Sequence, residues 1–175
     1  RIQSKGAKAA EEGIHDAVMR EAVIMQMTWP GAPTVYYGDE PVSADGRTRT
    51  IEELIRGVMK ISRCCNSTKK PFESTKAARH CVPVPTKCFI QHGDIGYGRF
   101  DKNERYAVIV NNTQETVNVA VPVWQIGVAD GSRMEQQLMS VAESFTKVPD
   151  IYVVTDGYLM VAMPRTSAVI LKDIG

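Results

Sequence analysis

The feature that most constrains this chain is a series of alternating apolar and polar residues in its second half. Segments such as TVNVAVPV (116–123) and YLMVAMP (158–164) place an apolar side chain at every second position. Because successive side chains of a β-strand point to opposite faces, this period of two predicts strands with one buried face. Short strands separated by frequent turn signals are typical of a small antiparallel sandwich. We therefore predict an all-β antiparallel sandwich over residues 91–175.

Two connections between these strands carry hairpin signals. RYAVIV (105–110) is joined to TVNVAVPV by the asparagine-rich NNTQE, and IYVVT (151–155) is joined to YLMVAMP by Asp-Gly. Asp-Gly is the stronger signal, since a two-residue hairpin turn needs residues that accept positive φ. We expect each pair to form a β-hairpin, and SAVILK (167–172) to supply a last strand.

The first 63 residues have a mixed pattern. Apolar residues at helical spacing predict a helix over residues 8–28, and Trp29-Pro30-Gly31 ends it because proline cannot continue the helical hydrogen bonds. The β-branched and aromatic run TVYY (34–37) then predicts one short buried strand. A second helix begins at the capping box formed by Thr50 and Glu53. These elements are typical of one αβ unit of a layered α/β protein.

Residues 64–90 show neither helical nor strand period, and we predict an irregular connector there. All four cysteines of the chain lie in it: Cys64, Cys65, Cys81 and Cys88. Zinc sites favour cysteines two to four residues apart, and neither the adjacent pair nor the later pair has that spacing. We expect free thiols ahead of a disulfide, and a disulfide ahead of a structural zinc site.

Composition and charge exclude some classes of partner. The 175-residue chain has a formal net charge of +1, which gives no field to attract nucleic acid or an anionic membrane surface. No apolar stretch approaches the roughly 20 residues needed to cross a bilayer. The start, RIQSKGAKAAEEG, is polar and lacks an apolar signal core. We assign the chain to the cytoplasm, and leave a secreted parent open because a chain without an initiating Met fits a processed or partial product.

Two pairs of adjacent residues could carry acid–base chemistry. Asp39 and Glu40 follow the predicted strand, where neighbours point in different directions. A glycosidase instead needs two carboxyl groups roughly 5 to 10 Å apart on opposite sides of the scissile bond. His15 and Asp16 fall within the first predicted helix, where neighbours diverge by about 100°. We therefore expect the carboxylates of Asp39 and Glu40 to be hydrogen-bonded to the backbone. We expect His15 and Asp16 to lie on the surface of the helix.

A specific motif points to a family. The segment AVMREAVIMQMTWPGAPTVYYGDE (17–40) closely resembles the part of the α-amylase superfamily, glycoside hydrolase family 13, that spans the seventh helix and eighth strand of its (β/α)8 barrel. Residues 97–172 resemble the β-sandwich that follows the barrel in neopullulanase- and maltodextrin-glucosidase-like enzymes. The family pattern Gly-x-Pro-x-hydrophobic-Tyr-Tyr-Gly-x-Glu is matched by Gly31, Pro33, Tyr36, Tyr37, Gly38 and Glu40.

The resemblance implies a division of the chain. Residues 1–63 would be the last elements of the TIM-barrel catalytic domain, an α/β fragment. Residues 64–90 would be the connector, and residues 91–175 the C-terminal sandwich domain. A complete barrel needs roughly 200 to 250 residues, so we expect the first part to be marginal by itself and the sandwich to be the most stable part.

The resemblance also implies a function for the parent protein, the retaining hydrolysis of α-glucosidic bonds in starch or maltodextrin. In the family the nucleophilic Asp, the acid/base Glu and the stabilising Asp follow strands four, five and seven. All three would precede residue 1, and we expect this chain alone to be inactive. Active sites of such barrels lie where the strands end, so the resemblance implies a substrate-pocket rim formed by Tyr37, Asp39, Glu40, Asp45 and Arg47. We expect no cofactor and no metal; the partner would be an α-glucan or maltooligosaccharide, and a homodimer of the parent fits the family.

The chain also departs from the family, since the loop after Glu40 is shortened to PVSADGRTRT (41–50) and the cysteine-bearing stretch has no counterpart. An alternative is a stand-alone sandwich that binds carbohydrate or another partner, and a third is a non-hydrolytic member of the superfamily. A sugar-binding module requires exposed aromatic side chains. Tyr97, Trp124 and Tyr158 are the candidates, and we expect each to be packed.

Overall fold

The computed structural model describes residues 15–30, 86–91 and 94–175. These residues form a helix, a short 3-10 helix and antiparallel strands. The elements are α1 (Asp16–Thr28), β1 (Thr86–Gln91), β2 (Asp94–Phe100), β3 (Arg105–Asn111), β4 (Val117–Val121), η3 (Val123–Ile126), β5 (Arg133–Ser140), β6 (Phe145–Thr146), β7 (Ile151–Val153), β8 (Leu159–Met163) and β9 (Ser167–Asp173).

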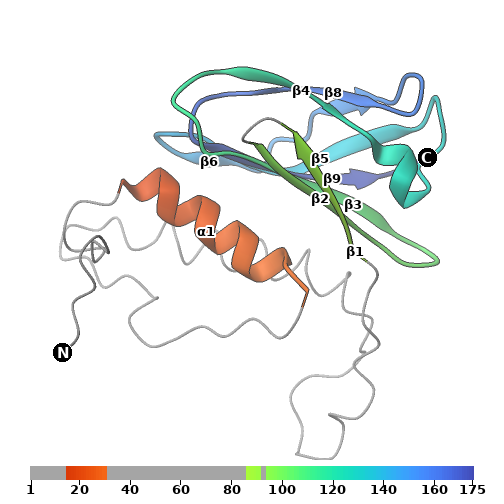
Figure 1. Cartoon of the computed structure of the whole chain (residues 1–175), viewed down its shortest axis with the longest axis horizontal. Helices are drawn as coiled ribbons and strands as arrows, with labels where there is room; N and C mark the ends of the chain where they lie inside the picture. Colours follow the sequence, from red (N-terminus) through yellow and green to blue (C-terminus); the bar gives the residue numbers. More distant parts are fainter. Residues whose placement is uncertain (1–14, 31–85, 92–93) are drawn as a thin grey trace, which may run out of the picture.

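The strands form two sheets that pack face to face. The larger sheet has the order β1-β2-β3-β9-β5-β6, with β7 also paired to β5, and the smaller sheet consists of β4 and β8. Figure 1 shows the smaller sheet on one face of the larger sheet and α1 on the other. The predicted antiparallel β-sandwich is therefore confirmed, with a helix as a third layer.

A separate apolar core fills each of the two interfaces. The core between the sheets includes Ile109, Leu159 and Met163, and the core under the helix includes Ile24, Met27, Tyr97 and Ile170. Strands β3 and β9 contribute to both cores, because successive residues point to opposite faces. This explains why YAVIV (106–110) and AVIL (168–171) are continuous apolar runs, the pattern of strands buried on both sides.

The predicted hairpin across NNTQE is wrong. Strand β3 pairs with β2 and β9, whereas β4 pairs with β8, so the connection crosses from one sheet to the other. Asn111, which is fully buried, explains the crossover. Its amide donates to the backbone oxygens of Glu115, Met163 and Pro164 at 2.9, 3.2 and 2.8 Å. The asparagine joins two crossover connections and does not close a turn.

The predicted Asp-Gly turn is present, but the hairpin around it is not. Asp156 and Gly157 have φ of 54° and 79°, and Thr155 and Tyr158 exchange backbone hydrogen bonds of 2.9 and 3.0 Å. Strand β7 then pairs with β5, and β8 pairs with β4. The turn therefore passes the chain from the larger to the smaller sheet.

The start of the chain can be compared only in part. Helix α1 ends at Thr28, directly before the Trp29-Pro30 stop that the sequence predicts. The predicted strand at 34–37, the helix from Thr50 and three of the cysteines lie outside the described residues. Strand β1 occupies the last residues of the predicted connector, and its Cys88 is an exposed free thiol. No helix of the described ranges combines the length and apolar character that a bilayer span requires.

Candidate functional site

The residues predicted at the substrate-pocket rim, Tyr37, Asp39, Glu40, Asp45 and Arg47, all lie outside the described residues. The described element that leads towards them is α1, whose end at Trp29-Pro30 immediately precedes the GAPTVYYGDE segment (31–40). The site that can be built from the structure is therefore the junction that holds α1 against the larger sheet.

The C-terminal end of α1 is fixed to β2 by polar and aromatic contacts. The Thr28 hydroxyl donates to the Ile24 carbonyl at 2.6 Å and is hydrogen-bonded to the Tyr97 hydroxyl. Arg99 Nη1 donates to the Thr28 carbonyl at 3.1 Å. The Trp29 ring meets the Tyr97 ring edge-on, with centroids 5.0 Å apart. These contacts set the direction in which the chain leaves the helix.

Tyr97 is the centre of this end of the junction. Burial raises the pKa of Tyr97 to about 12, more than the Thr28 hydrogen bond and the nearby Arg99 lower it. The phenol therefore stays protonated at neutral pH and can donate to Thr28, whose own hydrogen is directed at the helix.

The first half of α1 is fixed by Arg20. Its Nη2 donates to the carbonyls of Val141 and Ala142 at 2.8 Å each, and its Nε donates to the Ser140 hydroxyl at 3.2 Å. The planar guanidinium suits this arrangement because its donors point in fixed, divergent directions. The arginine thus binds the loop where β5 ends.

The neighbouring Glu21 is a buried carboxyl group, only 3% exposed. Loss of solvation raises the pKa of Glu21 to about 7, although Arg20 acts in the opposite direction. Its Oε1 has no hydrogen-bond partner within the described ranges. Such a group could exchange a proton near neutral pH, but it does not line the recess described next. We therefore assign Glu21 an effect on stability and no catalytic role. The sequence analysis did not identify this residue, since its one signal was that the charged pair Arg20-Glu21 lies between apolar positions of the helix.

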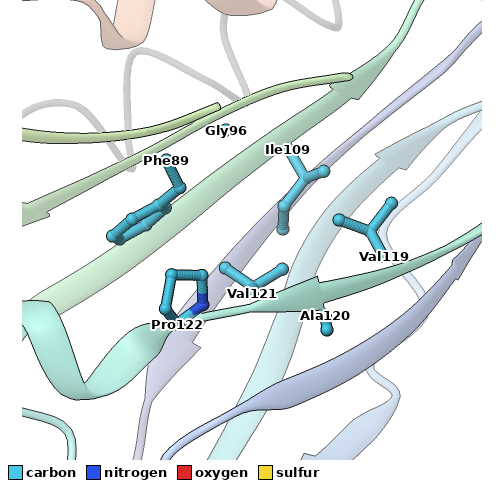
Figure 2. Close-up of a pocket in the computed structure, with 7 residues that line it drawn as sticks. All are labelled: Phe89, Gly96, Ile109, Val119, Ala120, Val121 and Pro122. Atoms are coloured by element: carbon cyan, nitrogen blue, oxygen red, sulfur yellow. The ribbon is translucent and has the colours of Figure 1, made fainter. Parts of the chain in front are cut away.

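A shallow recess opens between β4 and the β1–β3 part of the larger sheet. Figure 2 shows Phe89, Ile109 and Val121 around it, and its cavity volume is only about 10 Å³. Ligand pockets usually measure roughly 300 to 1,000 Å³ and carry a few polar groups. The residues that line this recess are all apolar or glycine. It offers no group for acid–base or metal chemistry.

The described histidine, His15, lies at the start of α1. His15 is the exposed N-cap of α1, and its Nδ1 accepts a hydrogen bond from the Ala17 amide at 3.2 Å. This capping role, at the helix start, replaces the predicted place on the helix surface. Within the described ranges, His, Cys, Asp and Glu side chains form no group of three that could hold a metal ion.

The three candidate aromatic side chains differ in exposure. Tyr97 is fully buried, as expected. Trp124 and Tyr158, expected to be packed, are 55% and 41% exposed, and that expectation is wrong for both. Trp124 faces outward because Val123 and Ile126 of the four-residue helix η3 occupy the core.

Comparisons with known proteins give a consistent picture of the fold. No protein-family model matches the chain. Among solved structures, an α-amylase from Geobacillus thermoleovorans in complex with acarbose matches with a TM-score of 0.63 at 14% identity, over 91% of this chain and 34% of that chain. An Anoxybacillus α-amylase matches with a TM-score of 0.59 at 18% identity, over 90% of this chain and 32% of that chain.

A debranching enzyme from Nostoc punctiforme also matches, with a TM-score of 0.56 at 16% identity, over 89% of this chain and 31% of that chain. The chain thus spans about a third of the length of the solved structures that it matches. The predicted resemblance to the α-amylase superfamily is confirmed at the level of the fold, and this chain shares the fold of the corresponding third of these α-amylases and of the debranching enzyme.

Proposed function

We propose that this chain is the C-terminal portion of a retaining α-glucan hydrolase of the α-amylase superfamily. Residues 1–63 would complete the catalytic barrel, and the sandwich would support it. The parent enzyme would cleave starch- or maltodextrin-like substrates through a glycosyl-enzyme intermediate formed on an aspartate, with a glutamate as acid and base. Those carboxylates would be supplied by polypeptide that precedes this chain.

The observation that carries the proposal is that the family motif at residues 31–40 follows a helix that packs on the sandwich. The GxPxxYYGxE motif directly follows α1. That helix packs on a sandwich whose fold is shared with α-amylases, one of them in complex with acarbose. The motif is a feature of the sequence and the fold a feature of the chain's arrangement in space, and both favour the same family.

The contacts of α1 suggest what the sandwich contributes. Arg20, in the first half of the helix, and Thr28, its last residue, connect the helix to the larger sheet and the loop after β5. A fixed helix end would hold the rim segment, with Tyr37, Asp39 and Glu40, at a constant position relative to the barrel. The sandwich would then act as a support for the substrate pocket, and cleavage would take place in the barrel.

The test is to express the open reading frame that includes the sequence upstream of Arg1 and to assay it on maltoheptaose. We expect hydrolysis with products that first appear in the α configuration by NMR. This chain alone should release no sugar. Glucose release by the isolated chain, or an upstream sequence without the barrel strands and their carboxylates, would contradict the proposal.

A second candidate, a carbohydrate-binding role for the sandwich, is favoured by the exposure of Trp124 and Tyr158. The two roles are compatible, because sugar binding outside a catalytic pocket needs no catalytic carboxylates.

A further inference from the structure

Trp124 and Tyr158 are exposed where the 3-10 helix η3 meets the Asp156-Gly157 turn. The 3-10 helix η3 packs through Val123 and Ile126 into the core between the sheets, whereas α1 packs into the other core. Figure 1 shows η3 at the end of the smaller sheet where β8 begins. Exposed apolar residues that gather on one surface can mark an interaction site, and Met160, 61% exposed, lies on the strand that follows Tyr158.

The backbone around these rings is held rigidly. The Trp124 amide donates to the Gly157 carbonyl at 3.1 Å, and the Gly157 amide donates to Asp130 Oδ1 at 3.2 Å. A Cβ atom at Gly157 would lie 3.1 and 3.2 Å from Cβ and Cδ1 of Trp124. Because glycine leaves that space open, the indole lies directly against the Asp156-Gly157 turn. The hydrogen bonds thereby connect η3, the loop with Asp130 and the turn before Tyr158. A ligand of Trp124 and Tyr158 would meet a preformed surface.

The chemistry of the surroundings is mixed but largely uncharged. Tyr158, Met160 and Ala162 alternate with core residues, so they share the outward face of β8. On the paired strand β4, Asn118 and Ala120 lie opposite Ala162 and Met160. This outward face of the smaller sheet carries no charged side chain. The carboxylates of Asp130 and Asp156 are confined to the loops beside the rings.

This combination fits a neutral sugar chain better than a charged partner. A pyranose ring has an apolar face of C–H groups that stacks on an aromatic ring, and hydroxyl groups at its edge that donate to carboxylates. Asp130 uses one oxygen for Gly157, and a carboxylate has about four acceptor sites in all. A nucleic acid would require a basic face, which this surface lacks.

We propose that Trp124 and Tyr158 form a non-catalytic binding surface for a neutral α-glucan chain, with Asp130 and Asp156 as hydroxyl acceptors. The choice of an α-glucan rests on the proposed function. The surface itself rests on the described residues alone. Binding at this surface would keep a polymeric substrate close to the parent enzyme.

The first experiment measures retardation of the full chain in native gels that contain soluble starch. We expect retardation of the wild type, and a loss of about tenfold in apparent affinity for Trp124→Ala and for Tyr158→Ala, which corresponds to about 1.4 kcal/mol for the loss of one stacked ring. The matched control is Ile151→Ala, which removes a residue of similar exposure, 52%, from the larger sheet. No retardation, or equal retardation of all variants, would overturn the proposal.

A second experiment avoids truncation of the tryptophan. The chain has only two tryptophans, Trp29 and Trp124, so Trp29→Phe leaves Trp124 as the single reporter. Titration with maltoheptaose should shift its emission to the blue and protect it from acrylamide, and Trp124→Phe should abolish the response. Cellohexaose should have a weaker effect. A response from Trp29 alone would overturn the proposal, as would self-association of the chain that Trp124→Ala abolishes.

These outcomes are independent of catalysis. Glucan binding without hydrolysis by the parent would refute the proposed function and leave the surface established, and hydrolysis without binding by this chain would do the opposite.

Discussion

At the scale of single residues, the most consequential group is the buried carboxyl of Glu21. Its pKa is raised from 4.5 to about 7 because burial removes water from the charged form. Between these pH values the folded chain holds a proton that the unfolded chain has lost. The stabilising contribution is therefore complete below about pH 4.5 and is lost as the pH rises through about 7.

We predict that the free energy of unfolding of the wild type falls with pH in this range, by at most about 1.4 kcal/mol per pH unit from this group. Glu21→Gln should remove that part of the slope and make the protein more stable than the wild type at pH 8, since the neutral amide carries no charge to bury. Urea unfolding at pH 5, 6, 7 and 8 measures the effect. Glu143→Gln, at a side chain 78% exposed, should keep the wild-type slope. An unchanged slope in Glu21→Gln would contradict the assignment.

At the scale of elements, the attachment of α1 depends on the geometry of Arg20. The guanidinium reaches two carbonyls and a hydroxyl at the end of β5. A lysine keeps the charge but has a single nitrogen, so it cannot make these bonds together.

We predict that Arg20→Lys weakens the docking of α1 by about 1–3 kcal/mol, since buried acceptors lose their donors. Amide hydrogen exchange in α1 should become faster, while exchange in β3 and β9 stays as in the wild type. Arg165→Lys, at a side chain 62% exposed, is the matched control and should change neither. If α1 keeps its protection in Arg20→Lys, the arginine is not the anchor that its contacts indicate.

The elements also show what sequence could and could not predict. The period of two in TVNVAVPV and YLMVAMP correctly identified β4 and β8, and the Pro30 stop correctly ended α1. Strand pairing was mispredicted, because alternation specifies which face is buried and leaves the partner strand open. Asn111 looks like a turn residue in sequence, and only its three backbone acceptors reveal a crossover. The exposure of Trp124 likewise depends on the 3-10 helix η3, and a segment of four residues is too short for its sequence to predict this helix.

At the scale of the whole molecule, the sheet order determines how stability is distributed. Strands β3 and β9 lie side by side in the middle of the larger sheet, with paired neighbours on both edges and a core on each face. Strands β1 and β6 lie at the two ends of the order, where one edge of each has no partner among the described strands. Helix α1 contacts the sheet through one face only.

We predict a corresponding gradient in native-state hydrogen exchange of the full chain. Amides of β3 and β9 should exchange only through global unfolding, because opening either strand disrupts both cores, whereas β1, β6 and α1 should open locally at lower free energy. In increasing urea, exchange of α1 should show a small m-value and exchange of β9 the full m-value of unfolding, since the m-value scales with the surface exposed. NMR exchange series at several urea concentrations measure both quantities. Equal opening free energies and m-values for α1 and β9 would mean that helix and sandwich unfold as one unit. The gradient predicted here instead requires a sandwich that keeps its fold while the helix detaches.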